Sequence, residues 1–94
     1  MSNSFNNQQV PHKAEDVLLQ AEAQVTMLAR AGIEGAYVLN DTSALVWDLI
    51  DGQMSADEIT NLLERAFSDS SQQVQTDVAS VLESFTQAKL ITWR

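Results

Sequence analysis

Residues 35–58 decide the fold of this chain, and they read GAYVLNDTSALVWDLIDGQMSADE. The segment 35–39 carries Tyr37, Val38 and Leu39, which predicts a half-buried strand. Asn40 is a good N-cap for a helix over residues 41–51, since its side-chain oxygen can accept an N–H that has no partner within the helix. Gly52 then predicts the end of that helix, because glycine adopts a left-handed conformation without a steric penalty.

Two more helices and a short closing segment are predicted after this glycine. Ser55 and Glu58 have the spacing of a capping box, in which each side chain accepts a backbone N–H at the start of a helix. A helix over residues 56–67 and another over 71–88 both carry apolar residues at helical spacing, which is typical of a face that packs on a core. Residues 90–93 are apolar enough to close the chain as a short extended segment on the same core.

Residues 14–30 allow two interpretations. Their helix propensity is good, and their apolar residues recur at helical spacing: Val17, Leu18, Ala21, Val25 and Leu28. The competing interpretation is a hairpin with strands over 17–21 and 25–29. No Asn-Gly or other glycine-containing turn marks that hairpin, so the local evidence favours a helix.

Length and composition predict one domain with one modest core. The chain has 94 residues, of which 45% are hydrophobic, as in ordinary globular proteins. Residues 1–13 are rich in Asn, Gln and Ser and predict a flexible N-terminal tail, with the domain proper over 14–94. We find neither a signal peptide nor a stretch of about 20 apolar residues, so we expect a cytoplasmic protein without a membrane span.

The charge and the residue types weigh against several classes of function. A net charge of −8 repels phosphate backbones and anionic membranes, so neither is an expected partner. The chain lacks cysteine and has a single histidine, His12, so we expect neither a metal site nor a catalytic triad. No phosphate loop is present, and the carboxylates stand mostly at helix ends and on polar faces. We therefore expect a non-enzymatic protein without a cofactor.

The combination of residues in the centre and the second half of the chain resembles the PqqD family, whose fold is also that of the RiPP recognition element. The likeness covers about residues 33–92. It is carried by Tyr37-Val38-Leu39-Asn40, Thr42-Ser43-Ala44, Val46-Trp47, Ile50-Asp51-Gly52, Glu58-Ile59, Leu63, Asp77-Val78, Leu82 and Leu90-Ile91.

The resemblance implies an α+β fold of the winged helix-turn-helix type, with a three-stranded antiparallel sheet followed by three helices. The resemblance assigns residues 14–30 to the first two strands. We follow this assignment in preference to the helix that the propensity of these residues favours. Residues 14–94 form one PqqD-like winged-helix peptide-binding domain.

The resemblance also implies a function, that of a non-catalytic peptide chaperone. Such proteins bind the leader of a ribosomally made precursor peptide as an extra strand and present it to a modifying enzyme. The implied partners are therefore the precursor peptide and a radical S-adenosylmethionine enzyme, another peptide-modifying enzyme or a leader peptidase. Carried over to this sequence, the strand edge is formed by Gly35, Ala36, Tyr37, Val38 and Leu39. The groove wall on the last helix is formed by Val74, Asp77, Val78 and Val81.

The sequence leaves two further questions open. The Pro-Glu pair that precedes the central strand in members of the pyrroloquinoline quinone (PQQ) pathway is absent, and residues 31–34 read AGIE, so another peptide-modification pathway is also implied. The alternative function is an acidic winged-helix interaction or regulatory domain without leader binding. A basic patch of Lys13, Arg30 and Lys89 favours the regulator, whereas an open apolar groove beside an unpaired strand favours the chaperone. An exposed edge also allows a strand-swapped homodimer.

Overall fold

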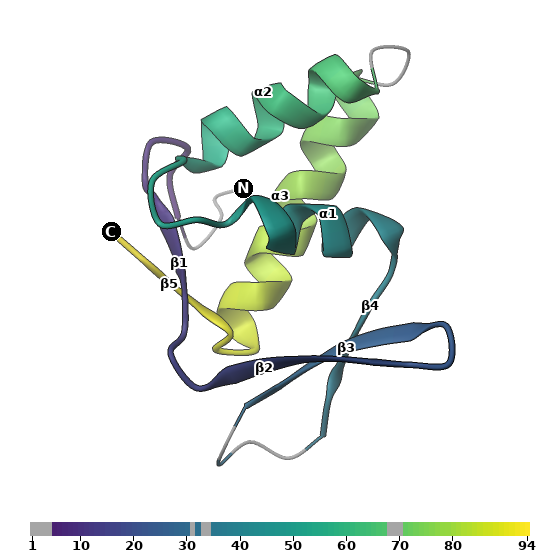
Figure 1. Cartoon of the computed structure of the whole chain (residues 1–94). Helices are drawn as coiled ribbons and strands as arrows, with labels where there is room; N and C mark the ends of the chain where they lie inside the picture. The colour runs from purple at the N-terminus through teal and green to yellow at the C-terminus, as the bar shows by residue number, and fades with distance from the viewer. Residues whose placement is uncertain (1–4, 31, 33–34, 68–70) are drawn as a thin grey trace.

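A computed structural model describes residues 5–30, 32, 35–67 and 71–94 of the chain. Helices α1, α2 and α3 pack on one another at one end of the molecule, and strands β2, β3 and β4 form a sheet at the other end (Figure 1). Strands β1 and β5 pair beside the helices. In chain order the elements are β1 (Pro11–Lys13), β2 (Val17–Glu22), β3 (Val25–Arg30), β4 (Tyr37–Leu39), α1 (Asp41–Leu49), α2 (Ala56–Ala66), α3 (Ser71–Gln87) and β5 (Ile91–Trp93).

The three-stranded sheet confirms the α+β fold that the resemblance implies. Its order is β2-β3-β4, both pairs are antiparallel, and Leu28 of β3 lies opposite Leu19 on one side and Tyr37 on the other. The helix favoured by local propensity over residues 14–30 is therefore wrong. The hairpin turns at Ala23, which adopts a positive φ of 50° without being a glycine, so no turn motif marked it. Burial of Leu28, which is only 1% exposed, favours the sheet over the local preference for helix.

Strand β4 and helix α1 are each two residues shorter than the sequence predicts, and a glycine explains the first of these differences. Strand β4 begins at Tyr37 and not at Gly35, whose φ of +83° does not fit an extended ladder. Helix α1 ends at Leu49, and Ile50 is its C-cap. The left-handed Gly52, with a φ of +80°, thus lies beyond the helix end, inside the loop to α2.

Aromatic rings on three elements meet at the centre of the core. Phe85 of α3 is fully buried, and its ring lies 5.4 Å from that of Tyr37 and 5.5 Å from that of Trp47, both in edge-to-face geometry. Phe85 thus joins α3 to β4 and to α1. The other buried apolar residues pack around this centre: Leu28, Leu39, Val46, Ile50, Ile59, Leu63, Val78, Leu82, Leu90 and Ile91.

Helices α1 and α2 both begin with a capping box. The predicted box of Ser55 and Glu58 is present, with bonds of 2.9 and 3.1 Å in the two directions. Asn40 caps α1 as predicted. Its Oδ1 accepts the Ser43 N–H at 2.8 Å, while the Ser43 hydroxyl oxygen accepts the Asn40 N–H at 2.8 Å. Each pair satisfies two backbone donors at a helix start.

Replacement of Asn40 by alanine is expected to lower the free energy of unfolding by about 1 kcal/mol, because the Ser43 N–H loses its acceptor. Urea denaturation followed by circular dichroism measures the difference. Asn61→Ala, on the exposed middle of α2, is the matched control and should not destabilise the protein, since alanine has the higher helix propensity. Equal stability of Asn40→Ala and wild type would contradict the capping role.

The loop between α1 and α2 is held by a carboxylate. Asp51 Oδ1 accepts the N–H groups of Met54 and Gln53, each at 2.9 Å. These backbone donors, that of Met54 first, lower the pKa of Asp51 below its ordinary value of 3.8. A Cβ atom at Gly52 would stand 3.2 Å from Nδ1 of His12, so this loop also lies directly against β1.

Residues 5–13, for which composition predicts a flexible tail, lie against the domain in the structure. Phe5 stacks on Trp93 with ring centroids 4.2 Å apart, and β1 pairs with β5 in an antiparallel register. The carbonyl groups of Gln9 and Asn7 accept the first N–H groups of α2, at 3.0 and 2.9 Å. The segment therefore satisfies donors that no residue within the helix can pair. Residues 1–4 of the predicted tail lie outside the described residues.

Candidate peptide-binding site

Strand β4 forms an edge of the sheet. It pairs with β3 through Leu28 and Tyr37, Met27 and Val38, and Thr26 and Leu39, and within the described residues no strand pairs with its other side. Leu39 is buried, whereas the side chain of Val38 is 62% exposed on the opposite face. An edge of this kind presents backbone N–H and C=O groups to which a further strand can bind.

A small, mostly apolar cavity lies beside this edge. Its volume is about 180 Å³, and it joins the start of β4 to the C-terminal end of α3. The lining residues are Leu28, Arg30, Gly35, Ala36, Tyr37, Ala88 and Leu90. Three residues of the predicted edge, Gly35, Ala36 and Tyr37, therefore line the same cavity, although only Tyr37 belongs to the strand.

The predicted groove wall on α3 lies further from the sheet than this cavity. The described lining includes none of Val74, Asp77, Val78 and Val81. Val78 is buried in the core, whereas Val74 and Val81 are partly buried against it. Asp77 is half-buried and accepts a hydrogen bond from Gln73 Nε2 at 2.9 Å.

The spacing along α3 shows how far each predicted groove residue lies from Phe85, the α3 residue that contacts β4. Phe85 is the α3 residue whose ring contacts Tyr37 of β4. Val81 precedes Phe85 by about one helical turn and Val78 by about two, whereas Val74 is about 16 Å away along the helix axis. Ala88 and Leu90 also line the cavity but were not predicted as site residues, because their only local signal is their position directly after the apolar stripe of α3.

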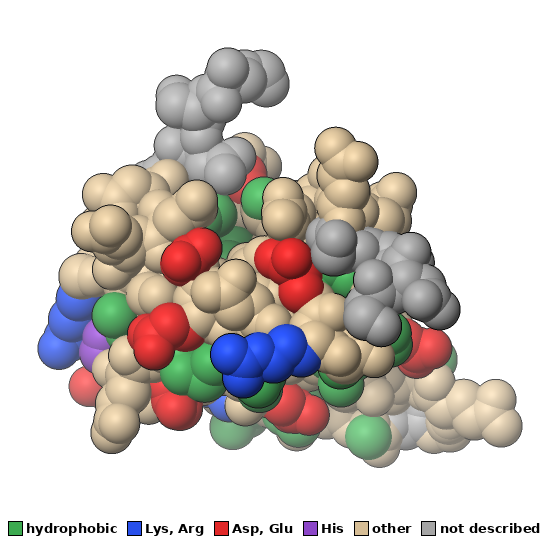
Figure 2. Space-filling model, turned by 90° about the horizontal axis from the view of Figure 1, so that it is seen from above, with side chains coloured by type: hydrophobic (Ala, Val, Ile, Leu, Met, Phe, Trp, Pro, Cys, Tyr) green, Lys and Arg blue, Asp and Glu red, His purple; other side chains and the backbone are tan. Residues whose placement is uncertain are grey.

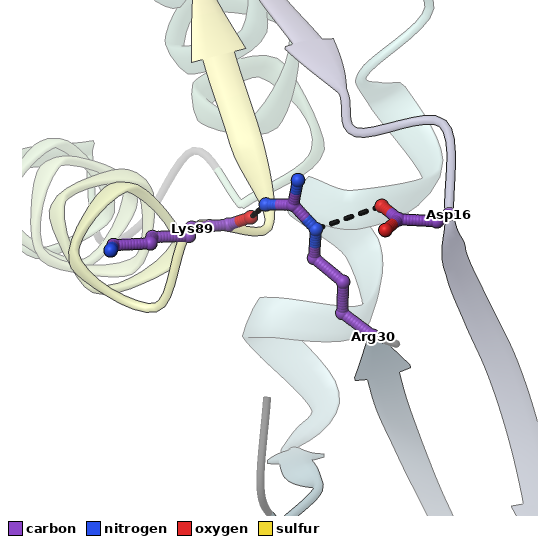
Figure 3. A network of polar contacts seen from close by, with 3 residues as sticks. All are labelled: Asp16, Arg30 and Lys89. Carbon is purple, nitrogen blue, oxygen red and sulfur yellow. Dashed lines mark hydrogen bonds and ion pairs between the residues drawn. The ribbon is translucent and has the colours of Figure 1, made fainter. Parts of the chain in front are cut away.

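Arg30 holds the end of β3 to the turn that follows α3. Its Nε lies 2.8 Å from Oδ1 of Asp16, and its Nη1 donates to the backbone carbonyl of Lys89. Figure 3 shows the guanidinium group between these two acceptors, with the ammonium group of Lys89 pointing away. The ion pair is partly exposed, so its contribution to stability is small, and it chiefly orients the guanidinium group at the rim of the cavity.

Among the described residues, no group of three or more His, Asp or Glu side chains is placed to hold a metal ion. The same part of the chain contains no helix with the length and hydropathy that crossing a membrane requires. The lowered pKa of Asp51 is explained by the backbone N–H groups of Met54 and Gln53 in its own loop, so it does not indicate a catalytic carboxylate.

The fold and the site together define a class of protein. It is a small α+β domain in which a three-stranded antiparallel sheet with an open edge precedes three helices. The family described as "Coenzyme PQQ synthesis protein D (PqqD)" matches residues 15–91, and the chain therefore belongs to this family. Comparisons with curated proteins and with solved structures give no significant match.

Family membership confirms the resemblance inferred from the sequence. The match includes residues 15–30, where the local pattern of the chain favoured a helix, and it ends at Ile91, the first residue of β5. Membership implies involvement in the synthesis of PQQ, in which the family acts as an accessory protein.

Proposed function

We propose that this protein binds the leader of a ribosomally made precursor peptide and presents it to a modifying enzyme, without itself catalysing a reaction. The leader adds to the open edge of β4 as a fourth strand. The observation that carries the proposal is the exposed β4 edge next to the apolar cavity, in a member of the PqqD family. The modifying enzyme is a radical S-adenosylmethionine enzyme or another peptide-modifying enzyme of the same pathway.

Strand addition explains how such a surface combines affinity with selectivity. Backbone hydrogen bonds to β4 form with any extended peptide and supply affinity. Alternate side chains of an added strand point to the same face, so every second residue of the leader faces the helices. An apolar leader residue at that position fits the cavity between Tyr37 and Ala88 and supplies selectivity.

The direct test is a calorimetric titration of the protein with synthetic leaders of the short peptides encoded beside its gene. We expect one leader to bind with a micromolar or lower Kd, about −8 kcal/mol or better. The partner enzyme should then modify that precursor faster when the protein is present. The absence of binding to every neighbouring leader would overturn the proposal.

Asp77→Ala tests whether the N-terminal half of α3 contributes to the same site. We expect a modest loss of leader affinity, about two- to threefold, because Asp77 is half-buried and already accepts a hydrogen bond from Gln73. The fold should stay intact, as the thermal midpoint will show. Unchanged affinity would remove Asp77 from the binding site and leave it a solvated helix carboxylate.

One observation favours a second candidate, protein interaction without leader binding. On the sheet face opposite the buried Leu28, three apolar side chains are exposed: Leu18 by 63%, Val25 by 41% and Val38 by 62%. An exposed apolar face of this kind is typical of a protein–protein contact, with the modifying enzyme or with a second copy of this chain. Binding of the enzyme by a protein that binds no leader would support this candidate.

A further inference from the structure

The positive charge of this acidic protein is concentrated at one cleft. An open cleft of about 600 Å³ lies among β1, β5 and the end of β3, and its lining includes Lys13, Arg30 and Arg94 together with Glu15 and Asp16. The cleft thus holds three of the five Lys and Arg residues but only two of the thirteen Asp and Glu residues, a net charge of +1. Two basic and eleven acidic residues remain elsewhere, a net charge of −9.

The surface view agrees with this distribution. In Figure 2 basic side chains lie beside a histidine side chain at the left edge of the molecule. Over the rest of the face that this view shows, acidic side chains are scattered, and one further basic group lies among them near the centre. His12 also lines the cleft, next to Lys13 on β1.

The cleft is adjacent to the proposed leader site. Arg30 lines both the cleft and the apolar cavity beside β4, so the two hollows share one wall. In the pairing of β3 with β4 the last matched residues are Leu28 and Tyr37, and Arg30 lies two residues further along β3. A strand bound to β4 that continues past Gly35 therefore leaves the sheet at the end where Arg30 lies, and Arg30 lines the cleft.

We propose that this cleft binds the carboxylate side chains of an acidic peptide segment, which directly adjoins the strand added to β4. This inference rests on the proposed function and specifies its substrate class, a leader with Asp or Glu next to its apolar strand. Carboxylates form short, charge-assisted hydrogen bonds with Lys and Arg. Arg30 is already oriented by Asp16 and by the Lys89 carbonyl, and these contacts use two of the five N–H donors of its guanidinium group.

An acidic peptide fits the cleft better than a nucleic acid. Binding to a nucleic acid depends on the neutralisation of many consecutive phosphates. The cleft offers three cations, two carboxylates line the same walls, and the remaining net charge of −9 repels a long polyanion. One or two carboxylates on a short peptide need only the local positive charge, because at about 0.15 M salt exposed charges are screened beyond about 8 Å.

A matched pair of peptides and a matched pair of variants test the proposal. The leader that binds in calorimetry is compared with a version in which its Asp and Glu residues are replaced by Asn and Gln. We expect this amide version to bind the wild type about tenfold more weakly. The double variant Lys13→Gln, Arg94→Gln should bind both versions with the same weakened affinity, whereas Arg65→Gln, a charge change on α2 outside the cleft, should behave as the wild type. Equal affinity of the wild type for the two versions would overturn the proposal.

A second measurement is independent of any leader. Amide chemical shifts are recorded by NMR at 0.15 M salt with the capped peptides tetraglutamate and tetraglutamine and with a short DNA duplex. We expect tetraglutamate alone, at millimolar concentration, to shift the signals of His12, Lys13 and Thr92. No shift with tetraglutamate, or a stronger response to DNA, would overturn the cleft assignment. If no leader binds while tetraglutamate shifts these signals, the proposed function fails and the carboxylate site remains.

Discussion

Replacement of Phe85 by alanine is expected to lower the free energy of unfolding by about 3–5 kcal/mol. Phe85 is fully buried, and its ring contacts Tyr37 of β4 and Trp47 of α1, so the variant leaves a cavity where three elements meet. The total stability of a domain of this size is about 5–15 kcal/mol, so a large part of it would be lost. Urea denaturation followed by tryptophan fluorescence and by circular dichroism measures the loss.

Leu62→Ala is the control for Phe85→Ala, because Leu62 lies on α2 with 41% of its surface exposed. Its removal should cost less than about 1 kcal/mol, since little buried surface is lost. A Phe85→Ala variant that is no less stable than Leu62→Ala would show that the aromatic cluster does not form the centre of the core.

Val38→Pro is expected to weaken leader binding tenfold or more while the protein stays folded. Proline lacks a backbone N–H, so the added strand loses a hydrogen bond to β4, and the ring occupies space at the edge. Proline is tolerated in an edge strand when its nitrogen faces solvent. The Kd from calorimetry with the cognate leader measures the effect, after the thermal midpoint has shown that the variant is folded.

Val38→Ala separates the backbone contribution from the side chain. It keeps the N–H and removes an exposed side chain, so the affinity should change threefold or less. If the N–H of Val38 faces Met27 in β3, Val38→Pro will instead lower the thermal midpoint. That result would assign the free hydrogen-bonding groups of the edge to Tyr37 and Leu39, because successive residues of a strand direct these groups to opposite sides. A folded Val38→Pro variant with unchanged affinity would place the leader away from this edge.

The cavity beside β4 and the cationic cleft share Arg30 in their linings. In the two proposals the β4 edge supplies backbone groups, the cavity at Ala88 and Leu90 takes an apolar side chain of the leader, and the cleft past Arg30 takes its carboxylates. The basic patch expected for a regulator, Lys13, Arg30 and Lys89, is only partly assembled. Lys13 and Arg30 line the cleft, whereas the ammonium group of Lys89 points away from Arg30 (Figure 3).

The position of Lys13 shows why the cationic cleft cannot be recognised from the order of charges in the sequence. Its ammonium group lies 4.9 Å from the ring centroid of Trp47, which a cation–π contact explains. In the sequence these two residues are far apart, and so are Arg30 and Arg94. The cleft was therefore not predictable from the composition, which indicates only an acidic protein.

The sequence by itself determined the helices and their starts. Asn40 caps α1, and Ser55 with Glu58 caps α2, because these contacts join residues only three positions apart. The apolar faces of α2 and α3 were predictable for a similar reason, since helical spacing places them on one side. The resemblance to the PqqD family was also carried by short local motifs, from residues 37–52 through the later helices to Leu90-Ile91.

Only the tertiary structure decided the β2-β3 hairpin, the position of the N-terminal segment and the lining of both hollows. The hairpin is stabilised by burial of Leu28 in the core. The helix propensity of residues 14–30 is a local preference and does not include this tertiary contact. Phe5 is placed by Trp93, at the other end of the chain. Contacts between distant residues follow from the packing of whole elements, and no local pattern of a single sequence carries that information.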